Sequence, residues 1–309
     1  MIYTVTLNPA LDKTVQVPNM TVDAVNRITE MRTDPGGKGI NVSKVIQKLG
    51  GESTVLALLG GSTGHKIADA LEEMGLKCRV TFIPGETRTN LKVVDPVRHT
   101  NTDINEPGIE VTGEILNGML CELVAMVKPG DIVAISGSLP KGSPKDTYYR
   151  WVSECKKAGA KAFLDVDGAL LADGLKAVPY LVKPNNEELS RLVGKPLETI
   201  EELTSAAGEL LDLGVEKVVV SMGGKGALYI TKETVIQAEG LKVPVGSTVG
   251  AGDSVVAALA VAEERGLSLE EAVCLSTATG AANVMCSGSQ AAEYEVIESL
   301  IGKVQYKVI

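Results

Sequence analysis

Residues 247–254, Ser-Thr-Val-Gly-Ala-Gly-Asp-Ser, combine the residue types of this chain best suited to chemistry. Gly250 and Gly252 let the backbone approach a ligand closely, and the apolar helix expected after them would turn its free N–H groups toward an anion such as a phosphoryl group. Asp253, at the start of that helix, could accept a proton from an attacking hydroxyl. An aspartate there can equally cap the helix, and spacing alone leaves both interpretations open.

Two more glycine-rich loops precede or follow predicted elements. Residues 34–41 read Asp-Pro-Gly-Gly-Lys-Gly-Ile-Asn, and residues 221–226 read Ser-Met-Gly-Gly-Lys-Gly. In the first loop Lys38 could meet a phosphate and Asn41 a sugar hydroxyl, but a flexible loop with a solvated lysine explains it equally well. A tight connection after a buried strand explains the second, which matches neither the Walker A pattern nor Gly-x-Gly-x-x-Gly.

Two polar segments could complete a phosphate site. In residues 183–188, Lys-Pro-Asn-Asn-Glu-Glu, the strand-end Lys183, Asn185 and Glu188 could organise phosphates and Mg²⁺ through water. Helix capping with acidic residues in the first turn is the simpler explanation. Arg88, in Thr-Arg-Thr-Asn, suits a planar phosphate contact, although a lone arginine on an edge strand is usually solvated.

Composition narrows the class of protein. The net charge of −9 disfavours a nucleic-acid or anionic-membrane surface but allows an anionic small ligand. Five cysteines without a Cys-x-x-Cys pair indicate neither a disulfide framework nor a zinc site, and two histidines are too few for a metal centre. The N-terminus lacks a signal-peptide pattern and no apolar run approaches about 18 residues, so we expect a cytoplasmic protein.

Strand and helix patterns alternate along the chain. Apolar strands are expected at residues 2–7, 53–59, 131–136, 161–165, 181–183 and 217–221, and helices at 40–49, 65–74, 113–127, 144–158, 186–193, 200–213, 253–265 and 269–285. This rhythm predicts an α/β fold with a doubly wound, mainly parallel sheet flanked by helices. More polar strands near residues 14–33 and 89–102 do not fit the rhythm and could form a small separate sheet.

Together these segments resemble the ribokinase-type (PfkB) carbohydrate kinase family from end to end. The motifs that carry the resemblance are residues 6–12 (TLNPALD), 35–41 (PGGKGIN), 87–90 (TRTN), 135–140 (ISGSLP), 183–185 (KPN), 221–226 (SMGGKG) and 247–254 (STVGAGDS). Each motif is short, and their number and order make the assignment specific. The similarity is greatest to the phosphosugar branch, 1-phosphofructokinase and tagatose-6-phosphate kinase. Residues 102–108 (TDINEPG) and 247–254 (STVGAGDS) favour the former. The minor 6-phosphofructokinase would carry an extra arginine near residues 100–102, which this chain lacks.

The resemblance implies an architecture and partners. The whole chain, residues 1–309, would be one ribokinase-like kinase domain, with a β-sheet lid formed by about residues 13–33 and 88–105. Such lids commonly pair with a second subunit, so a homodimer through the lid is expected. The implied reaction is the ATP- and Mg²⁺-dependent phosphorylation of D-fructose 1-phosphate, with tagatose 6-phosphate as the alternative substrate.

The resemblance also implies roles for individual residues. Asp253 would be the catalytic base, beside an anion hole of the backbone amides of Gly250, Ala251, Gly252 and Asp253. The phosphosugar would be held by Asp12, Gly37, Lys38, Asn41, Arg88, Ser138 and Arg27. ATP would be held by Lys183, Asn185, Ser221, Gly223, Gly226, Thr248 and Asn283, and Mg²⁺ by Glu188, largely through water. The apolar segment at residues 278–283 would lie near adenine.

Two other functions fit the same scaffold less well. A non-catalytic sugar-phosphate or nucleotide sensor would be favoured by loss of the base or of the anion hole, and both are present. A nicotinamide-dependent Rossmann enzyme would need Gly-x-Gly-x-x-Gly after its first strand, which this chain lacks.

Overall fold

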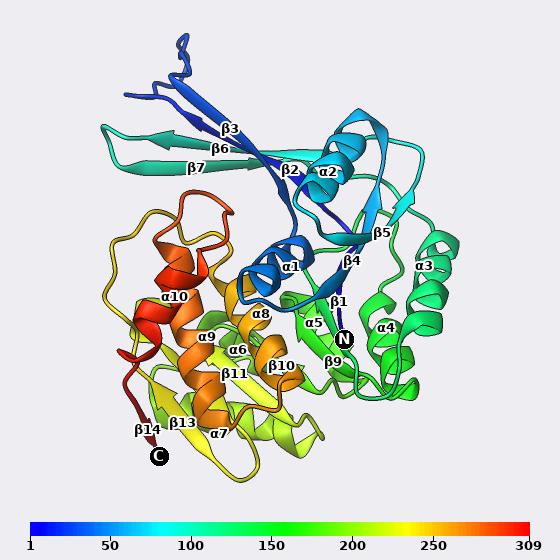
Figure 1. Cartoon of the computed structure of the whole chain (residues 1–309), viewed down its shortest axis with the longest axis vertical. Coiled ribbons are helices and arrows are strands. Elements are labelled where there is room, and N and C mark those ends of the chain that lie inside the picture. Colours follow the sequence, from blue (N-terminus) through cyan, green and yellow to red (C-terminus); the bar gives the residue numbers. More distant parts are fainter.

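A ten-stranded sheet forms the centre of the molecule in the computed structural model, which describes all 309 residues (Figure 1). In spatial order its strands are β14 (Tyr306–Val308), β13 (Val235–Ala238), β12 (Ala227–Ile230), β11 (Lys217–Ser221), β10 (Leu181–Val182), β9 (Lys161–Asp165), β8 (Ile132–Ser136), β1 (Ile2–Thr6), β4 (Ser53–Leu59) and β5 (Lys77–Phe82). The neighbouring strands β11, β10, β9, β8, β1, β4 and β5 are parallel to one another. Strands β12, β13 and β14 extend the sheet antiparallel. The mainly parallel sheet predicted from the sequence is confirmed.

Helices cover both faces of this sheet, because strands buried on both sides expose apolar residues in two directions. One face packs against α1 (Lys38–Lys48), α2 (Gly61–Glu73), α8 (Ala251–Glu264), α9 (Leu269–Val284) and α10 (Tyr294–Ile301). The other packs against α3 (Gly113–Met126), α4 (Thr147–Lys157), α5 (Gly168–Leu175), α6 (Asn186–Val193) and α7 (Ile200–Asp212). No helix is long and apolar enough to span a membrane.

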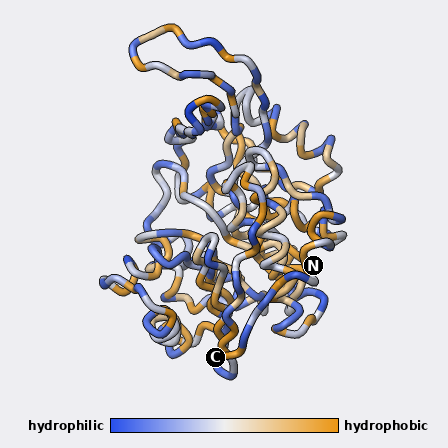
Figure 2. Tube along the Cα trace, turned by 90° about the vertical axis from the view of Figure 1, so that its left-hand side faces the viewer, coloured by the Kyte–Doolittle hydropathy of each residue, from blue (hydrophilic) through white to orange (hydrophobic).

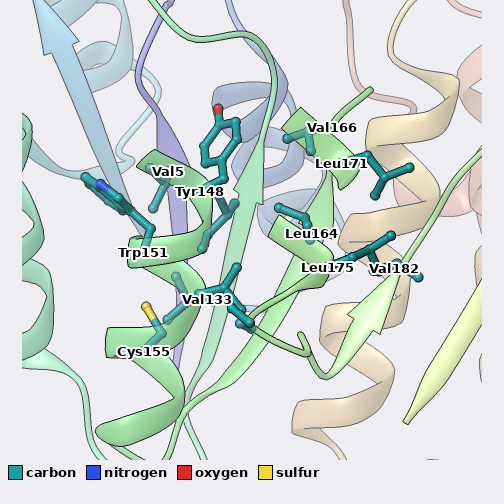
Figure 3. Close-up of a cluster of buried hydrophobic side chains, with 14 of the residues drawn as sticks. Val5, Val133, Tyr148, Trp151, Cys155, Leu164, Val166, Leu171, Leu175 and Val182 are labelled. Carbon is teal, nitrogen blue, oxygen red and sulfur yellow. The ribbon is translucent and has the colours of Figure 1, made fainter. Parts of the chain in front are cut away.

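Side chains of α4 pack against β1 and β8 near the carboxyl ends of these strands (Figure 3). Trp151 and Tyr148 of α4 are fully buried with Val5 of β1 and Val133 of β8. The Tyr148 hydroxyl donates a hydrogen bond of 2.9 Å to the carbonyl oxygen of Gly137, just after β8. Core packing therefore fixes the position of the turn that follows this strand.

A separate four-stranded sheet, here called the lid sheet, lies beyond the carboxyl ends of the parallel strands. Its order is β3 (Glu30–Gly36), β2 (Ala10–Gln16), β6 (Arg88–Asp95) and β7 (Thr100–Asn105). The connection between β2 and β3 projects past the body, and hydrophobic segments are concentrated in the body below it (Figures 1 and 2). The polar strands that did not fit the α/β rhythm thus form the small sheet that was expected.

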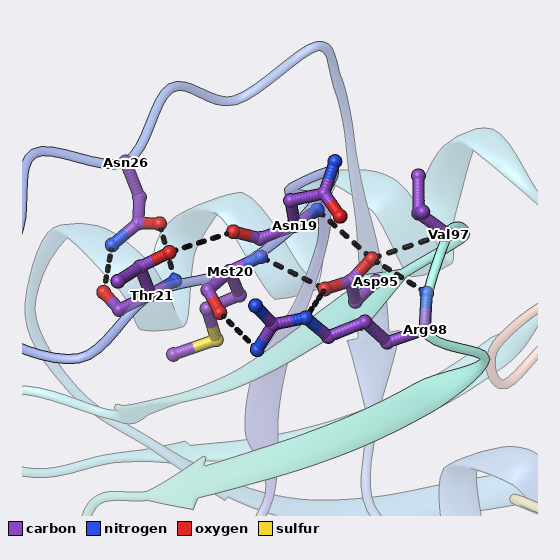
Figure 4. Close-up of polar contacts among 7 residues, drawn as sticks. All are labelled: Asn19, Met20, Thr21, Asn26, Asp95, Val97 and Arg98. Carbon is purple, nitrogen blue, oxygen red and sulfur yellow. Dashed lines mark hydrogen bonds and ion pairs between the residues drawn. The ribbon is translucent and has the colours of Figure 1, made fainter.

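Asp95 fastens the outer end of the lid sheet (Figure 4). Its buried carboxylate accepts hydrogen bonds from the backbone N–H groups of Asn19, Met20, Val97 and Arg98, at 2.8 to 3.1 Å. Burial raises the pKa of Asp95, but these bonds outweigh it and lower the pKa. The carboxylate therefore ties the segment after β2 to the turn between β6 and β7.

Some boundaries differ from the sequence-based predictions. Helix α8 begins at Ala251 rather than Asp253, so Ala251 and Gly252 also belong to its first turn. Strand β7 extends to Asn105, past the polar strands expected near residues 89–102. All its side chains are exposed, so it has no buried alternation and is held by its pairing with β6. Helices α5 and α10 and strand β14 are short, and were not predicted.

Candidate active site

A cavity of about 1200 Å³ opens between the lid sheet and the carboxyl ends of the parallel strands. This is where ligands bind in open α/β sheets. Seventeen of the predicted site residues line it: Asp12, Gly37, Lys38, Asn41, Arg88, Ser138, Lys183, Asn185, Glu188, Ser221, Gly223, Gly226, Thr248, Gly250, Ala251, Gly252 and Asp253. Arg27 and Asn283 do not. Segments spread over most of the sequence therefore meet at one place.

Asp253 lies in the first turn of α8, and its side chain is not used to cap that helix. The N-cap position is Gly250, which has no side chain. Asp253 is only 6% exposed and accepts a hydrogen bond of 2.9 Å from the amide nitrogen of Asn41. The alternative that Asp253 merely caps the helix does not hold.

Burial and, after it, the nearby charge of Asp165 raise the pKa of Asp253, to about 6 once the opposing contacts are included. Lys38, the hydrogen bond from Asn41 and Lys183 oppose this rise. A carboxylate with a pKa near neutrality is suited to accept a proton from a substrate hydroxyl.

Backbone geometry shapes the loop in front of α8. Gly250 has φ of 78°, a left-handed conformation that favours glycine, and a Cβ atom there would lie 3.2 Å from the side-chain nitrogen of Asn283. That nitrogen donates to the carbonyl oxygen of Val249 at 3.3 Å. Asn283 is thus buried behind the loop, outside the cavity. Asn283 supports the conformation of the loop. Its predicted contact with ATP stays a prediction.

Asp165, the last residue of β9, is a site residue that the sequence analysis missed. Its carboxylate lies 3.2 Å from the ammonium of Lys183 and 3.4 Å from that of Lys38. Burial raises the pKa of Asp165, but the two lysines outweigh it and the pKa is lowered. A carboxylate ending a buried strand was the available signal. Lys38 consequently lies beside Asp165 and near Asp253. Its role as an anchor for the phosphate of the sugar stays a prediction.

The glycine in the first turn of α1 brings Lys38 and Asn41 close to strand β1. A Cβ atom on Gly39 would lie 2.5 Å from the carbonyl oxygen of Val5, so only glycine fits there. The Ile40 N–H donates to the Thr6 hydroxyl at 3.0 Å. This close contact holds the N-terminus of α1 against the end of the central sheet.

Asp12 and Arg88, at the lid side of the cavity, are held by polar neighbours. Asp12 accepts a hydrogen bond of 3.1 Å from Asn90, and burial raises its pKa. The Arg88 guanidinium donates to the carbonyl oxygens of Asn8 and Glu106. The Asn8 amide in turn donates to the Ser138 hydroxyl at 3.1 Å. Asn8 and Asn90 belong to the motifs that contain Asp12 and Arg88, and were missed as site residues.

At the opposite end of the cavity, Asn185 and Glu188 form a reciprocal capping box at the start of α6. The backbone N–H of Ser221 donates to the carbonyl oxygen of Pro184 at 3.0 Å, which joins the two loops. An apolar wall completes this end and was only partly predicted: Leu241, Val243, Val245, Gly280, Ala281 and Val284.

Arg27 lies in the exposed connection between β2 and β3 and does not line the cavity. Its part in substrate binding stays a prediction. No group of three or more acidic, cysteine or histidine side chains is arranged to hold a metal ion. A divalent cation would therefore depend on phosphate oxygens and water for most of its ligands.

A glycine loop at a helix N-terminus, with a buried carboxylate of raised pKa beside it, is suited to phosphoryl transfer on this doubly wound fold. The chain belongs to the pfkB family of carbohydrate kinases, whose sequence pattern matches residues 5–295. The family and its relatives show a sugar-phosphate kinase that uses ATP, and not a nicotinamide-dependent enzyme.

Individual relatives match over nearly their whole length. The chain is 36% identical over 309 residues to the 1-phosphofructokinase of Haemophilus influenzae, covering 100% of this chain and 98% of that protein. It is 40% identical over 278 residues to the 1-phosphofructokinase of Rhodobacter capsulatus, covering 90% and 88%. The phosphofructokinase-2 of Escherichia coli in complex with potassium is similar in structure, with a TM-score of 0.93 at 32% identity and 98% coverage of each chain. A tetrameric inhibited form of that enzyme matches with a TM-score of 0.91 at 33% identity, again covering 98% of each chain.

Proposed function

We propose that this kinase transfers the γ-phosphoryl group of ATP to D-fructose 1-phosphate, giving D-fructose 1,6-bisphosphate and ADP. The observation that carries the substrate assignment is the identity of 32 to 40% to relatives named 1-phosphofructokinase, over at least 89% of this chain. The arrangement of Asp253, Asn41 and the glycine loop supports the reaction type.

In the proposed mechanism, Asp12 and Asn41 bind sugar hydroxyls while Arg88, Ser138 and Lys38 bind the phosphate already on the sugar. The free primary hydroxyl then faces Asp253. Asp253 takes its proton as the oxygen attacks the γ-phosphorus in line, and the bond to the leaving ADP breaks. The amides of residues 250–253 stabilise the charge on the transferred group, which is most of what phosphoryl transfer requires.

The nucleotide would occupy the other end of the cavity. We assign its phosphates to Lys183, Asn185 and the loop at residues 221–226, and its base to the apolar wall that includes Val243 and Ala281. Glu188 lines the cavity and fits a Mg²⁺ ion held mainly by ATP oxygens and water. When bound, Mg²⁺ neutralises charge on the β- and γ-phosphates.

We propose that the lid sheet closes over the sugar and pairs with the lid of a second copy. Supporting this, β3 and β7 carry exposed apolar side chains, Met31 at 59% and Ile104 at 53%, and Val22 and Val25 in the β2–β3 connection are more than 80% exposed. Exposed apolar clusters on a lid favour association. Sedimentation velocity should show a dimer, and Met31→Lys together with Ile104→Lys should give a monomer. An unchanged dimer would place the interface elsewhere.

Tagatose 6-phosphate is the alternative substrate, because it also carries a phosphate at one end and a primary hydroxyl at the other. The test is a coupled ADP-release assay that compares kcat/KM for fructose 1-phosphate, tagatose 6-phosphate and fructose 6-phosphate side by side. We expect fructose 1-phosphate to be preferred by at least about tenfold, the effect of one well-placed hydrogen bond of about 1.4 kcal/mol. A preference for either other sugar would overturn the substrate assignment and leave the kinase assignment intact.

A further inference from the structure

Lys44, a buried lysine in the middle of α1, has no role in the site as described above. It is only 7% exposed, and lysine is rarely buried without a partner. Its ammonium group donates to the carbonyl oxygen of Pro35 and, at 3.4 Å, to the side-chain oxygen of Asn41. Asn41 is the residue whose amide nitrogen donates to Asp253. Lys44, Asn41 and Asp253 therefore form a continuous chain of polar contacts.

The direction of this chain follows from the chemistry of its ends. An ammonium group can only donate hydrogen bonds, so it requires the oxygen of the Asn41 amide to face it. The NH₂ group of the same amide must then face Asp253, which accepts best when ionised. A neutral side chain at residue 44 would not impose this orientation, and the amide could turn its oxygen toward the carboxylate.

We propose that Lys44 is a positioning residue for phosphoryl transfer: its ammonium group fixes the orientation of the Asn41 amide, which thereby donates to Asp253 and keeps it a proton acceptor. The proposal deepens the proposed function, since it depends on Asp253 acting as the base. Lys44 does not touch the reacting atoms itself. It acts through Asn41.

Three carboxylates oppose the loss of the Lys44 proton, although the net pKa of Lys44 is lowered. Burial is the largest cause of that lowering and Arg32 of β3 adds to it, while Asp34 of β3, Asp12 of β2 and Asp253 of α8 act in the opposite direction. The groups that face Asp253 are Asp165 at the end of β9, Lys38 and Asn41 of α1, and Lys183 after β10. Lys44 is thus the cation placed between the carboxylates of the lid sheet and the base.

The same ammonium also joins the lid sheet to the base, because Pro35 lies near the end of β3. Any movement of β3 that displaced Pro35 would move one of the two partners of Lys44. The bond to Pro35 helps to keep the ammonium aimed at Asn41.

The test is Lys44→Met, which keeps the length of the side chain and removes the charge. The acidic limb of the kcat/KM pH profile for the phosphosugar should move to higher pH by about one unit, since losing a nearby cation and the oriented donor disfavours the carboxylate. KM for ATP should stay within about twofold. Lys48→Met, on the same helix but paired with Glu293 at the surface, is the matched control and should leave the profile unchanged. An unshifted limb in folded Lys44→Met would overturn the proposal.

A double-mutant cycle separates the path through Asn41 from a general loss of structure. In an Asn41→Ala background the shift caused by Lys44→Met should be clearly smaller, and an equal shift in both backgrounds would contradict positioning through Asn41.

Lys44→Arg retains the charge and should restore most of the wild-type profile; failure to do so would also count against the proposal. If Lys44→Met does not fold, Lys44→Gln keeps a donor and should show a smaller shift in the same direction, and no shift would refute it. Loss of turnover in Asp253→Asn with an unshifted Lys44→Met profile would sink only this inference. Normal turnover in Asp253→Asn would sink the proposed base itself.

Discussion

The ammonium group of Lys183 lies 3.2 Å from the carboxylate of Asp165, and both side chains are almost fully buried. Lys38, which begins helix α1 about 145 residues earlier in the chain, approaches the second oxygen of the same carboxylate. One aspartate therefore fixes two of the cations that face the cavity. It also raises the pKa of Asp253, so it acts on the site through charge without being the proposed base.

Replacing this aspartate should be costly. Asp165→Asn leaves two cations without their counter-ion, and breaking a buried pair typically lowers the free energy of unfolding by about 3–5 kcal/mol. The pKa of Asp165 is lower in the folded than in the unfolded protein. Its contribution to the free energy of unfolding is therefore complete above the unfolded pKa and is lost as the pH falls through the folded pKa. Urea unfolding at pH 7 should show the loss. Glu154→Gln, which breaks an exposed pair with Lys157, is the control and should cost less than about 1 kcal/mol. Equal costs would contradict the account of the buried pair.

The pH profile of the wild-type enzyme should follow Asp253. Because its pKa is raised to about 6 and the carboxylate is the active form, kcat/KM should fall as the pH drops through 6, approaching roughly tenfold for each further pH unit. Residual activity of Asp165→Asn should have its acidic limb at lower pH, because a like charge is removed. A wild-type profile that stays flat down to pH 5, with the protein folded throughout, would argue against a base of raised pKa.

Gly250→Ala should impair turnover more than folding. The change places a Cβ atom in a left-handed backbone and against Asn283, so the loop amides should shift and kcat should fall by about 10²-fold, the usual effect of losing one donor of an anion hole. Gly194→Ala is a matched control, because Gly194 has φ of 72° and open space around it. Both variants should lose about 1 kcal/mol of stability, but only Gly250→Ala should lose turnover. Comparable kcat losses would show that strain alone explains the effect.

The two proposed phosphate anchors can be tested through KM. Arg88→Ala or Lys38→Ala should raise KM for the phosphosugar much more than KM for ATP, since each removes a charged contact worth about 1.5–3 kcal/mol. Steady-state kinetics with either substrate varied would measure both constants. Lys141→Ala, at an exposed lysine paired with Glu110, is the control. An equal rise in both KM values would mean that the substituted residue does not bind the phosphate of the sugar. The test matters most for Lys38, because Lys38 lies beside Asp165.

Local sequence patterns predicted much of the fold and part of the site. Buried apolar runs such as residues 132–136 mark the parallel strands, and the glycines before Lys38 and Asp253 mark the loops at their ends. These features are local, because glycine is required where the backbone touches a neighbour, as Gly39 touches Val5. Strand β7 has no such local signal and depends on β6 for its structure.

The missed residues act through contacts that are distant in sequence. Asp165 looks like the end of an ordinary strand until Lys38 and Lys183 are seen on its two oxygens. Lys44 looks like a helix-surface lysine until it is found buried beside Asn41. Asn283 was predicted to touch ATP; its amide nitrogen donates to the carbonyl oxygen of Val249 behind the loop, and its contact with ATP stays a prediction. Periodicity reports one element at a time, and these roles arise where several elements meet.

The most direct test of the account is the turnover of Asp253→Asn. This change keeps the shape of the side chain but removes the proton acceptor, so kcat should fall by roughly 10²–10⁴-fold while ATP binding is retained. Because burial raises the pKa of Asp253, its charge costs stability above pH 6, and the variant should be more stable than wild type at pH 8 by an amount on the order of 1–3 kcal/mol. A folded Asp253→Asn enzyme with near-normal kcat would contradict the central claim.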